Sequence, residues 1–319
     1  MIIPRLRVVF FGSPAFAVPS LRRLVQVPGV DVCAVVTQPD RPAGRGQALT
    51  EPAVKSEARI LVPGASILQP EKIRTGEFEA TLRALAADLF VVVAYGRILP
   101  QSILDLPALG PWNVHASLLP RWRGAAPIQW AVIAGDQETG VAIMRMEAGL
   151  DTGPVAAVAT TAIDASETAG TLSVRLAALG AELLATTLPR IVDKTVALLP
   201  QDETRATVAR LLRKEDGNLD FGQPARQVAS RARGVDPWPG ASAPLDGAAV
   251  KLFGARAVSA VGAPAVPGTV ISIDGDGLCV ACADGAVAFA EVQVPGRKRL
   301  PAAVVAAGRS IAVGARFGA

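Results

Sequence analysis

The only histidine of this chain marks where its chemistry is expected. Of 319 residues, His115 alone carries an imidazole, so any proton transfer by histidine near neutral pH must use it. In an extended segment, residues two apart point to the same side, which places Asn113 beside His115. An amide donor can stabilise a developing oxyanion while an imidazole carries a proton. The two side chains together indicate a reaction at a carbonyl group.

A third polar residue belongs with this pair. Asp151 lies in a loop that is bracketed by glycines, where aspartate commonly serves turn chemistry. A carboxylate near an imidazole also orients the ring and favours its protonated form. We therefore interpret Asn113, His115 and Asp151 as a candidate catalytic set. Ser117 does not lie in a nucleophile elbow, so direct attack by an amine on an acyl or formyl group fits better than a covalent intermediate.

Alternating strand and helix signals in the first 190 residues predict the frame that holds these side chains. The expected buried strands are 6–11, 32–36, 87–95 and the segment of Asn113 and His115. Such alternation is typical of a parallel sheet that helices cover on both faces. Ligands of these sheets bind beyond the carboxyl ends of the strands. The first strand ends in Gly-Ser-Pro-Ala-Phe, not in G-x-G-x-x-G, which disfavours a dinucleotide.

The chain changes character near residue 208. A long amphipathic helix is expected over 167–195, and short valine-rich strands separated by Gly, Pro and Asp follow beyond 208. That spacing is typical of a small barrel or sandwich. From residue 209 on, thirteen lysines and arginines face nine acidic residues, so this part carries the whole net charge of +4. We expect an α/β protein with domains 1–190 and 209–319 joined by a linker, 191–208.

Composition excludes several classes of protein. Apolar residues make up 50% of the chain and charged residues 19%, which predicts a folded core and argues against disorder. Cys279 and Cys282 would point to opposite faces of an expected strand, so we expect no metal site there or elsewhere. No uninterrupted apolar run reaches the roughly 18–20 residues that span a bilayer, and the N-terminus lacks a signal-peptide pattern. The expectation is a cytoplasmic monomer without a membrane partner.

The segment around His115 resembles the signature of the 10-formyltetrahydrofolate-dependent formyltransferases. The resemblance rests on Asn113-Val114-His115 and the following Ser117-Leu118-Leu119-Pro120. It implies that Asn113, His115 and Asp151 are catalytic and that the formyl donor is 10-formyltetrahydrofolate, with no metal. It also implies a Rossmann-like parallel-sheet domain followed by a small β-barrel of the OB-like kind. The residues that it assigns to folate contact are Ser117, Leu118, Leu119 and Pro120.

Further segments narrow the acceptor. The loop 37–46 is similar to the insertion loop of the family members that formylate methionyl initiator tRNA, and segments 120–129 and 237–241 match those members as well. A Gly/Pro-rich loop with arginines can adapt to an irregular nucleic-acid end and meet its phosphates. The resemblance therefore implies formyl transfer to the α-amino group of methionyl initiator tRNA. The expected tRNA-binding residues are Arg41, Arg45, Arg297, Lys298 and Arg299.

Two alternatives stay open on the sequence alone. Family members that formylate amino-sugar nucleotides also have Ser-Leu-Leu-Pro and a C-terminal domain. A nucleic-acid-binding protein with an inactive α/β domain is compatible with the composition, although the intact Asn113, His115 and Asp151 argue against it.

Overall fold

The computed structural model describes residues 5–43, 48–259, 265–308 and 311–318. The chain forms two compact units, each built from three segments. The first unit comprises 1–125, 140–161 and 173–209, and the second comprises 126–139, 162–172 and 210–319. The predicted division into a catalytic domain (1–190), a linker (191–208) and a tRNA-binding domain (209–319) stays a prediction.

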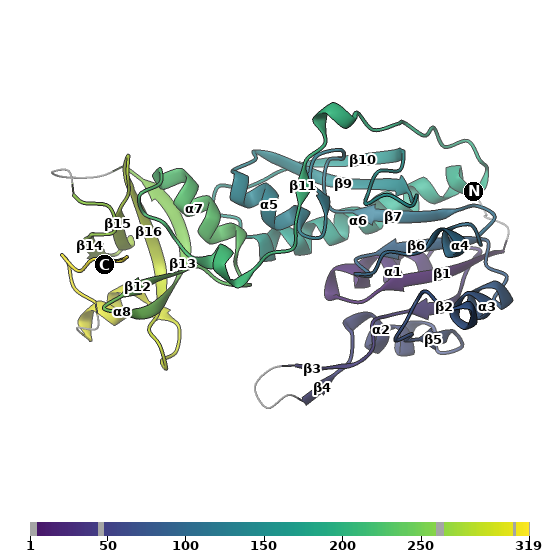
Figure 1. Ribbon diagram of the computed structural model, residues 1–319, viewed down its shortest axis with the longest axis horizontal. Coiled ribbons are helices and arrows are strands. Elements are labelled where there is room, and N and C mark those ends of the chain that lie inside the picture. The colour runs from purple at the N-terminus through teal and green to yellow at the C-terminus, as the bar shows by residue number, and fades with distance from the viewer. Residues whose placement is uncertain (1–4, 44–47, 260–264, 309–310, 319) are drawn as a thin grey trace. The chain divides into compact units, whose positions relative to one another are not determined.

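A seven-stranded sheet forms the centre of the first unit (Figure 1). Its strands are β1 (Leu6–Gly12), β2 (Val30–Val36), β5 (Ser66–Leu68), β6 (Leu89–Val93), β7 (Pro111–His115), β9 (Glu138–Arg145) and β10 (Val155–Ala162). Their order is β10-β9-β7-β6-β1-β2-β5. The pairs that link β5, β2, β1, β6 and β7 are all parallel, which confirms the predicted Rossmann-like sheet. β9 differs, because it runs antiparallel to β7.

The central strands are continuous apolar runs because side chains on both faces are buried. In β1, Val9 and Phe11 are fully buried in one cluster with Phe78 of α3 (Gly76–Ala84) and Ile103 of α4 (Gln101–Leu104). The intervening residue Phe10 is equally buried. A strand that is covered on both faces has no polar alternation, which is the signal on which the parallel-sheet prediction rests.

The long helix α6 (Ala169–Val192) covers part of the sheet with its segment 173–192. A Cβ at Gly180 would lie 2.8 Å from Cγ1 of Val114 in β7, so the helix approaches the sheet too closely there for a larger residue. Among the described residues, α6 is the one helix long and apolar enough to span a membrane by length and composition. Half of its apolar window is buried inside the protein, as in the core helix of a soluble protein. Arg175 and Glu182 interrupt its apolar residues, so a search for an uninterrupted run misses it.

Three smaller features complete the first unit. α1 (Val18–Val25), after a short 3-10 turn over Ala15–Ala17, packs with α2 (Ala53–Leu61). β3 (Arg41–Ala43) and β4 (Ala48–Thr50) form an antiparallel hairpin that extends away from the sheet (Figure 1). β8 (Arg123–Gly124) and β11 (Val208–Ala209) pair in parallel and tie the loop after β7 to the chain that follows α6.

The second unit is an antiparallel sheet with helices. The strands β12 (Ser242–Leu245), β13 (Ala248–Val258), β16 (Ala286–Gln293), β15 (Gly277–Ala281) and β14 (Val270–Asp274) are neighbours in this order, and β17 (Leu300–Pro301) pairs with β16. The helices are α5 (Pro127–Ala134), α7 (Ala225–Gly234) and α8 (Ala302–Ala307). Phe221 packs against Phe289 and Phe317 in the core, with ring centroids 6.2 and 5.8 Å away. The predicted C-terminal β domain is confirmed as an antiparallel sheet domain, while its predicted start at residue 209 stays a prediction.

Candidate active site

The carboxyl ends of the parallel strands meet at one edge of the first unit's sheet. Gln38, just after β2, links the ends of β1 and β6: its backbone N–H donates to Oγ of Ser13 after β1, and its Nε2 donates to the carbonyl of Tyr95 after β6. Both distances are 2.9 Å. The adjacent strand β7 ends at His115. The edge at which a parallel sheet binds ligands therefore includes the predicted catalytic histidine.

Asn113 is held from the neighbouring strand and has one polar atom to spare. Its Nδ2 donates to the carbonyl oxygen of Val92 at 3.1 Å, which leaves the second amide hydrogen for another acceptor. Its Oδ1 is buried and has no hydrogen-bond partner among the described residues. A buried acceptor without a partner is costly, so this oxygen is suited to accept an N–H from a bound substrate.

His115 is buried, with 6% of its surface exposed. Its Nε2 lies 3.0 Å from the carbonyl oxygen of Trp122. Because a carbonyl oxygen only accepts, Nε2 carries the proton in this arrangement. Nδ1 faces Oδ2 of Asp151 at 3.7 Å, and a proton on Nδ1 would complete an ion pair. The ring can therefore gain and lose a proton at Nδ1, beside a carboxylate.

Asp151 is fixed by the same loop that holds His115. Its Oδ2 accepts a hydrogen bond of 2.8 Å from the backbone N–H of Gly124, two residues after Trp122. Gly124 has a φ of +118°, and a Cβ at this position would lie 2.7 Å from the carbonyl oxygen of Ala209. Only glycine fits both conditions. The structure thus brings together Asn113, His115 and Asp151, while their roles in catalysis stay a prediction.

The loop predicted to contact folate follows directly. Ser117 is fully buried, and its hydroxyl donates to the carbonyl oxygen of Arg121 at 2.6 Å. That hydroxyl therefore shapes the loop from within. Leu118, Leu119 and Pro120 are half-buried, and Leu119 packs against the small cluster that contains Met144. Folate contact by these four residues stays a prediction.

The hairpin predicted to bind tRNA is clamped at its base. Asp40 precedes β3 and Glu51 follows β4, and the buried Lys55 of α2 contacts both: its Nζ lies 2.6 Å from Oδ2 of Asp40 and 3.3 Å from Oε1 of Glu51. The hydrogen bond from Lys55 to Asp40 raises the pKa of the lysine, which keeps it charged. Arg41 is exposed at the start of β3 and lies 3.7 Å from Glu71. Arg45 lies outside the described residues.

The basic cluster of the second unit lies in the turn between β16 and β17. Arg297 and Lys298 are exposed there. Arg299 instead pairs with Glu291, and its guanidinium lies over the Phe253 ring, 4.0 Å from the centroid. Two of the three predicted tRNA-binding cations are thus presented to solvent, while the third is engaged with its own domain.

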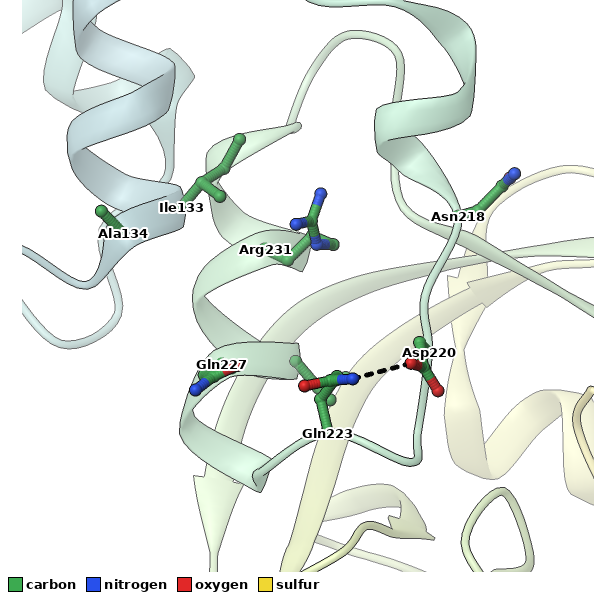
Figure 2. Close-up of a pocket in the computed structure, with 8 residues that line it drawn as sticks. Ile133, Ala134, Asn218, Asp220, Gln223, Gln227 and Arg231 are labelled. Carbon is green, nitrogen blue, oxygen red and sulfur yellow. Dashed lines mark hydrogen bonds between the residues drawn. The ribbon is translucent and has the colours of Figure 1, made fainter. Parts of the chain in front are cut away.

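A separate pocket of about 440 Å³ lies in the second unit, lined by the end of α5, the start of α7 and the loop before α7. Gln223 Nε2 donates to Oδ2 of Asp220 at 2.9 Å, and Arg231 is another of its polar lining residues (Figure 2). The pocket contains none of the predicted site residues.

Within the described part of the chain, no group of three or more His, Cys, Asp and Glu side chains is placed to hold a metal ion.

Sequence reasoning did not identify several groups that hold the candidate catalytic residues. They are the carbonyl of Trp122, the N–H of Gly124 and the side chain of Gln201, whose Nε2 donates to the carbonyl oxygens of Asp151 and Gly153. The first two are backbone groups, which carry no residue signature. Gln201 lies in the stretch assigned to a linker, for which no contact with the candidate site was predicted.

Comparison with known proteins identifies the family. The formyl transferase family profile matches residues 6–188, and that of the formyl transferase C-terminal domain matches 211–310. Methionyl-tRNA formyltransferase from Sorangium cellulosum (strain So ce56) is 48% identical over 316 residues, which cover 98% of this chain and 100% of the relative. The enzyme of that name from Anaeromyxobacter dehalogenans (strain 2CP-C) is 51% identical over 294 residues, 92% of this chain and 93% of its own.

Among solved structures, WlaRD, a sugar 3N-formyl transferase, has a similar fold. It was crystallised in the presence of dTDP and 5-N-formyl-THF, and it matches with a TM-score of 0.66 at 15% identity over 92% of this chain and 99% of its own. This likeness concerns the fold alone. The sequence matches are much stronger and run nearly end to end. The chain therefore belongs to the formyl transferase family, among its methionyl-tRNA formyltransferases.

Proposed function

We propose that this protein transfers the formyl group of 10-formyltetrahydrofolate to the α-amino group of methionyl initiator tRNA. The observation that carries the proposal is the group formed by Asn113, His115 and Asp151 at the carboxyl edge of the sheet. It occurs in a chain that is 48% identical to a methionyl-tRNA formyltransferase along almost its whole length. The same proposal places a monomeric enzyme in the cytoplasm.

The folate is consumed in each turnover and is therefore a substrate. Its use is supported by the formyl transferase family profile and by the formyl-folate named with the sugar 3N-formyl transferase of similar fold. On this chain, the unpartnered Oδ1 of Asn113 offers a buried acceptor to a substrate N–H. We assign the folate-binding wall to the loop of Ser117, Leu118, Leu119 and Pro120. Leu118, Leu119 and Pro120 supply its partly exposed apolar surface.

The reaction needs one bond formed, one bond broken and one proton moved. The amine nitrogen bonds to the formyl carbon, the bond between that carbon and N10 of the folate breaks, and the proton lost by the amine is balanced by one gained at N10. The free hydrogen on Nδ2 of Asn113 stabilises the developing oxyanion, a role worth on the order of 3 kcal/mol. His115 moves the proton at Nδ1, with Asp151 beside it to orient the ring and balance its charge.

The choice of tRNA over an amino-sugar nucleotide rests on sequence. The fold does not distinguish the two acceptors, because a sugar 3N-formyl transferase shares it at 15% identity. The full-length matches at 48% and 51% favour tRNA. In this proposal the tRNA contacts are Arg41 and Arg45 of the segment 37–46, and Arg297, Lys298 and Arg299 in the second unit.

The proposal is tested by transfer of labelled formyl from 10-formyltetrahydrofolate to initiator methionyl-tRNA, with elongator methionyl-tRNA as a parallel acceptor. We expect strong preference for the initiator. Asp151→Asn should lower kcat by about 10²–10⁴-fold, because the carboxylate beside His115 is lost, while both substrates still bind. Asp276→Asn, at an exposed aspartate of the second unit, is the matched control.

Two results would contradict the proposal in different ways. Normal turnover by Asp151→Asn would remove Asp151 from the chemistry. Absence of transfer to either tRNA by the native enzyme, with folate still bound, would reject the acceptor and direct the assay to amino-sugar nucleotides.

A further inference from the structure

The segment 201–209, which leads from the first unit into the second, lies against the loop that holds both candidate proton-handling groups. β11 pairs with β8, so Val208 and Ala209 lie beside Arg123 and Gly124. Thr207 adds two bonds of 2.9 Å: its Oγ1 accepts from the N–H of Trp122, and its carbonyl accepts from the N–H of Arg123. The Arg123 N–H and the Trp122 carbonyl belong to the same peptide group. The segment therefore bonds directly to the peptide group whose carbonyl holds His115.

Gln201, the first residue of the segment, contacts the Asp151 loop directly. Its Nε2 donates to the carbonyl oxygen of Asp151 at 2.8 Å and to that of Gly153 at 2.7 Å. Its Oε1 accepts from Nε of Arg123 at 3.0 Å. The two carbonyls require the NH₂ group of the amide, and the guanidinium requires its oxygen. The Gln201 amide therefore has only one allowed orientation.

Arg123 keeps that amide in place. Its guanidinium is buried and forms two hydrogen bonds to the Glu203 carboxylate, of 2.8 and 2.7 Å. These bonds raise the pKa of Arg123, so the guanidinium stays charged. Because Gln201 has a fixed partner on each side, it connects the loop after β7 to the loop of Asp151.

The Asp151 loop needs such a support. Asp151 has a φ of +53°, in the left-handed region that non-glycine residues adopt only where their surroundings hold them. Oδ2 of its carboxylate accepts a hydrogen bond from the Gly124 N–H and lies 3.7 Å from Nδ1 of His115. A shift of the loop backbone by a fraction of this distance would separate the carboxylate from the ring.

We propose that Gln201 is a positioning residue for Asp151: its amide holds the backbone on both sides of Thr152, so that the carboxylate stays beside His115. The inference rests on the proposed catalytic function of Asp151. Gln201 contacts the Asp151 loop directly and, through Arg123, the loop that holds His115. A substitution that keeps the acceptor for Arg123 therefore tests the support of the Asp151 loop.

The decisive variant is Gln201→Glu. It keeps an acceptor for Arg123 but turns an oxygen toward the carbonyls of Asp151 and Gly153. We expect kcat to fall about 10- to 100-fold, the scale on which displacing a reacting group by about 1 Å reduces turnover. KM for folate and for tRNA should change less than about twofold, since both ends of this amide are hydrogen-bonded within the chain. Gln137→Glu is the matched control, because exposed Gln137 donates to the Gly135 carbonyl in the second unit.

A double-mutant cycle separates positioning from general structural support. If Gln201 acts through Asp151, adding Gln201→Glu to Asp151→Asn lowers kcat no further. If the two losses instead multiply, or KM rises with kcat unchanged, the positioning role is overturned.

The outcomes also separate this inference from the proposed function. Full activity in Gln201→Glu with a slow Asp151→Asn would reject the inference and leave the function standing. A native enzyme that formylates no tRNA would reject the function first. If Gln201→Glu does not fold, Gln201→Met removes both the donor to the two carbonyls and the acceptor for Arg123 without adding charge, and kcat should fall at least as far. Failure of both to fold would show a purely structural residue.

Discussion

An ion pair between a half-exposed arginine and a buried aspartate, at the start of residues 210–319, yields a quantitative prediction. Asp216 is 9% exposed by its side chain, and its two oxygens accept from Nη1 and Nη2 of Arg210 at 2.7 and 2.5 Å. Oδ2 also accepts from the backbone N–H of Arg213 at 2.7 Å. The Arg210 hydrogen bonds are the largest cause that lowers the pKa of Asp216 from 3.8 to about 2. Asp216→Asn should therefore destabilise this unit.

The size of the loss follows from that pKa. A fall from 3.8 to about 2, at roughly 1.4 kcal/mol per unit of pKa, corresponds to between about 2 and 3 kcal/mol. Arg210 is 45% exposed, so solvent screens part of the attraction, and we expect a loss of about 1–2 kcal/mol in the free energy of unfolding at pH 7. Because the folded-state pKa is depressed, the contribution is complete above pH 3.8 and is lost as the pH falls toward 2.

Urea denaturation followed by circular dichroism measures the loss, and hydrogen exchange assigns the transition to residues 210–319. Asp276→Asn is the control, because its ion pair with Arg256 is equally short, at 2.6 Å, but the aspartate is 76% exposed. This control should cost less than about 0.5 kcal/mol. The reasoning is refuted if both variants lose the same free energy. It is also refuted if the Asp216→Asn deficit is as large near pH 3 as at pH 7.

Two further predictions concern tRNA. Lys55→Met should raise KM for tRNA several-fold with little change in kcat, because Asp40 and Glu51 at the two ends of the hairpin lose their common partner. Lys194→Met, at an exposed lysine, is the control. An unchanged KM in Lys55→Met would contradict a positioning role for Lys55. Removing Arg297 and Lys298 together should weaken tRNA binding and reduce the slope of log affinity against log salt by up to about 2. A salt titration of tRNA affinity with an unchanged slope would exclude this turn from the interface.

The sequence was sufficient to predict the strand-borne part of the candidate site. Asn113 and His115 share one side of a strand because of the two-residue period, and the apolar Trp112 and Val114 alternate with them on the other side. The parallel sheet was likewise predictable from its apolar runs. The antiparallel direction of β9 was not, because strand direction depends on how the chain returns between β7 and β9, which local hydropathy does not record.

The loop-borne part required the structure. The polar residues of 200–204 look like a solvated linker, since Gln, Asp and Glu at that spacing have no apolar face. Arg123 is buried, and the acceptor of its Nε–H, Gln201, lies 78 residues away in the sequence. A buried polar group is invisible to a hydropathy pattern when its partner is remote.

The three candidate catalytic side chains consequently differ in how firmly they are held. Asn113 sits in a central strand and bonds to β6, so it moves only if the sheet does. His115 ends the same strand but depends on the Trp122 carbonyl for its orientation. Asp151 lies wholly in a loop, supported by Gly124 and Gln201. Local opening of a protein begins where packed and hydrogen-bonded contacts are fewest. Loss of the carboxylate from His115 should therefore be the first step by which mild denaturant inactivates this enzyme, before the oxyanion donor is displaced.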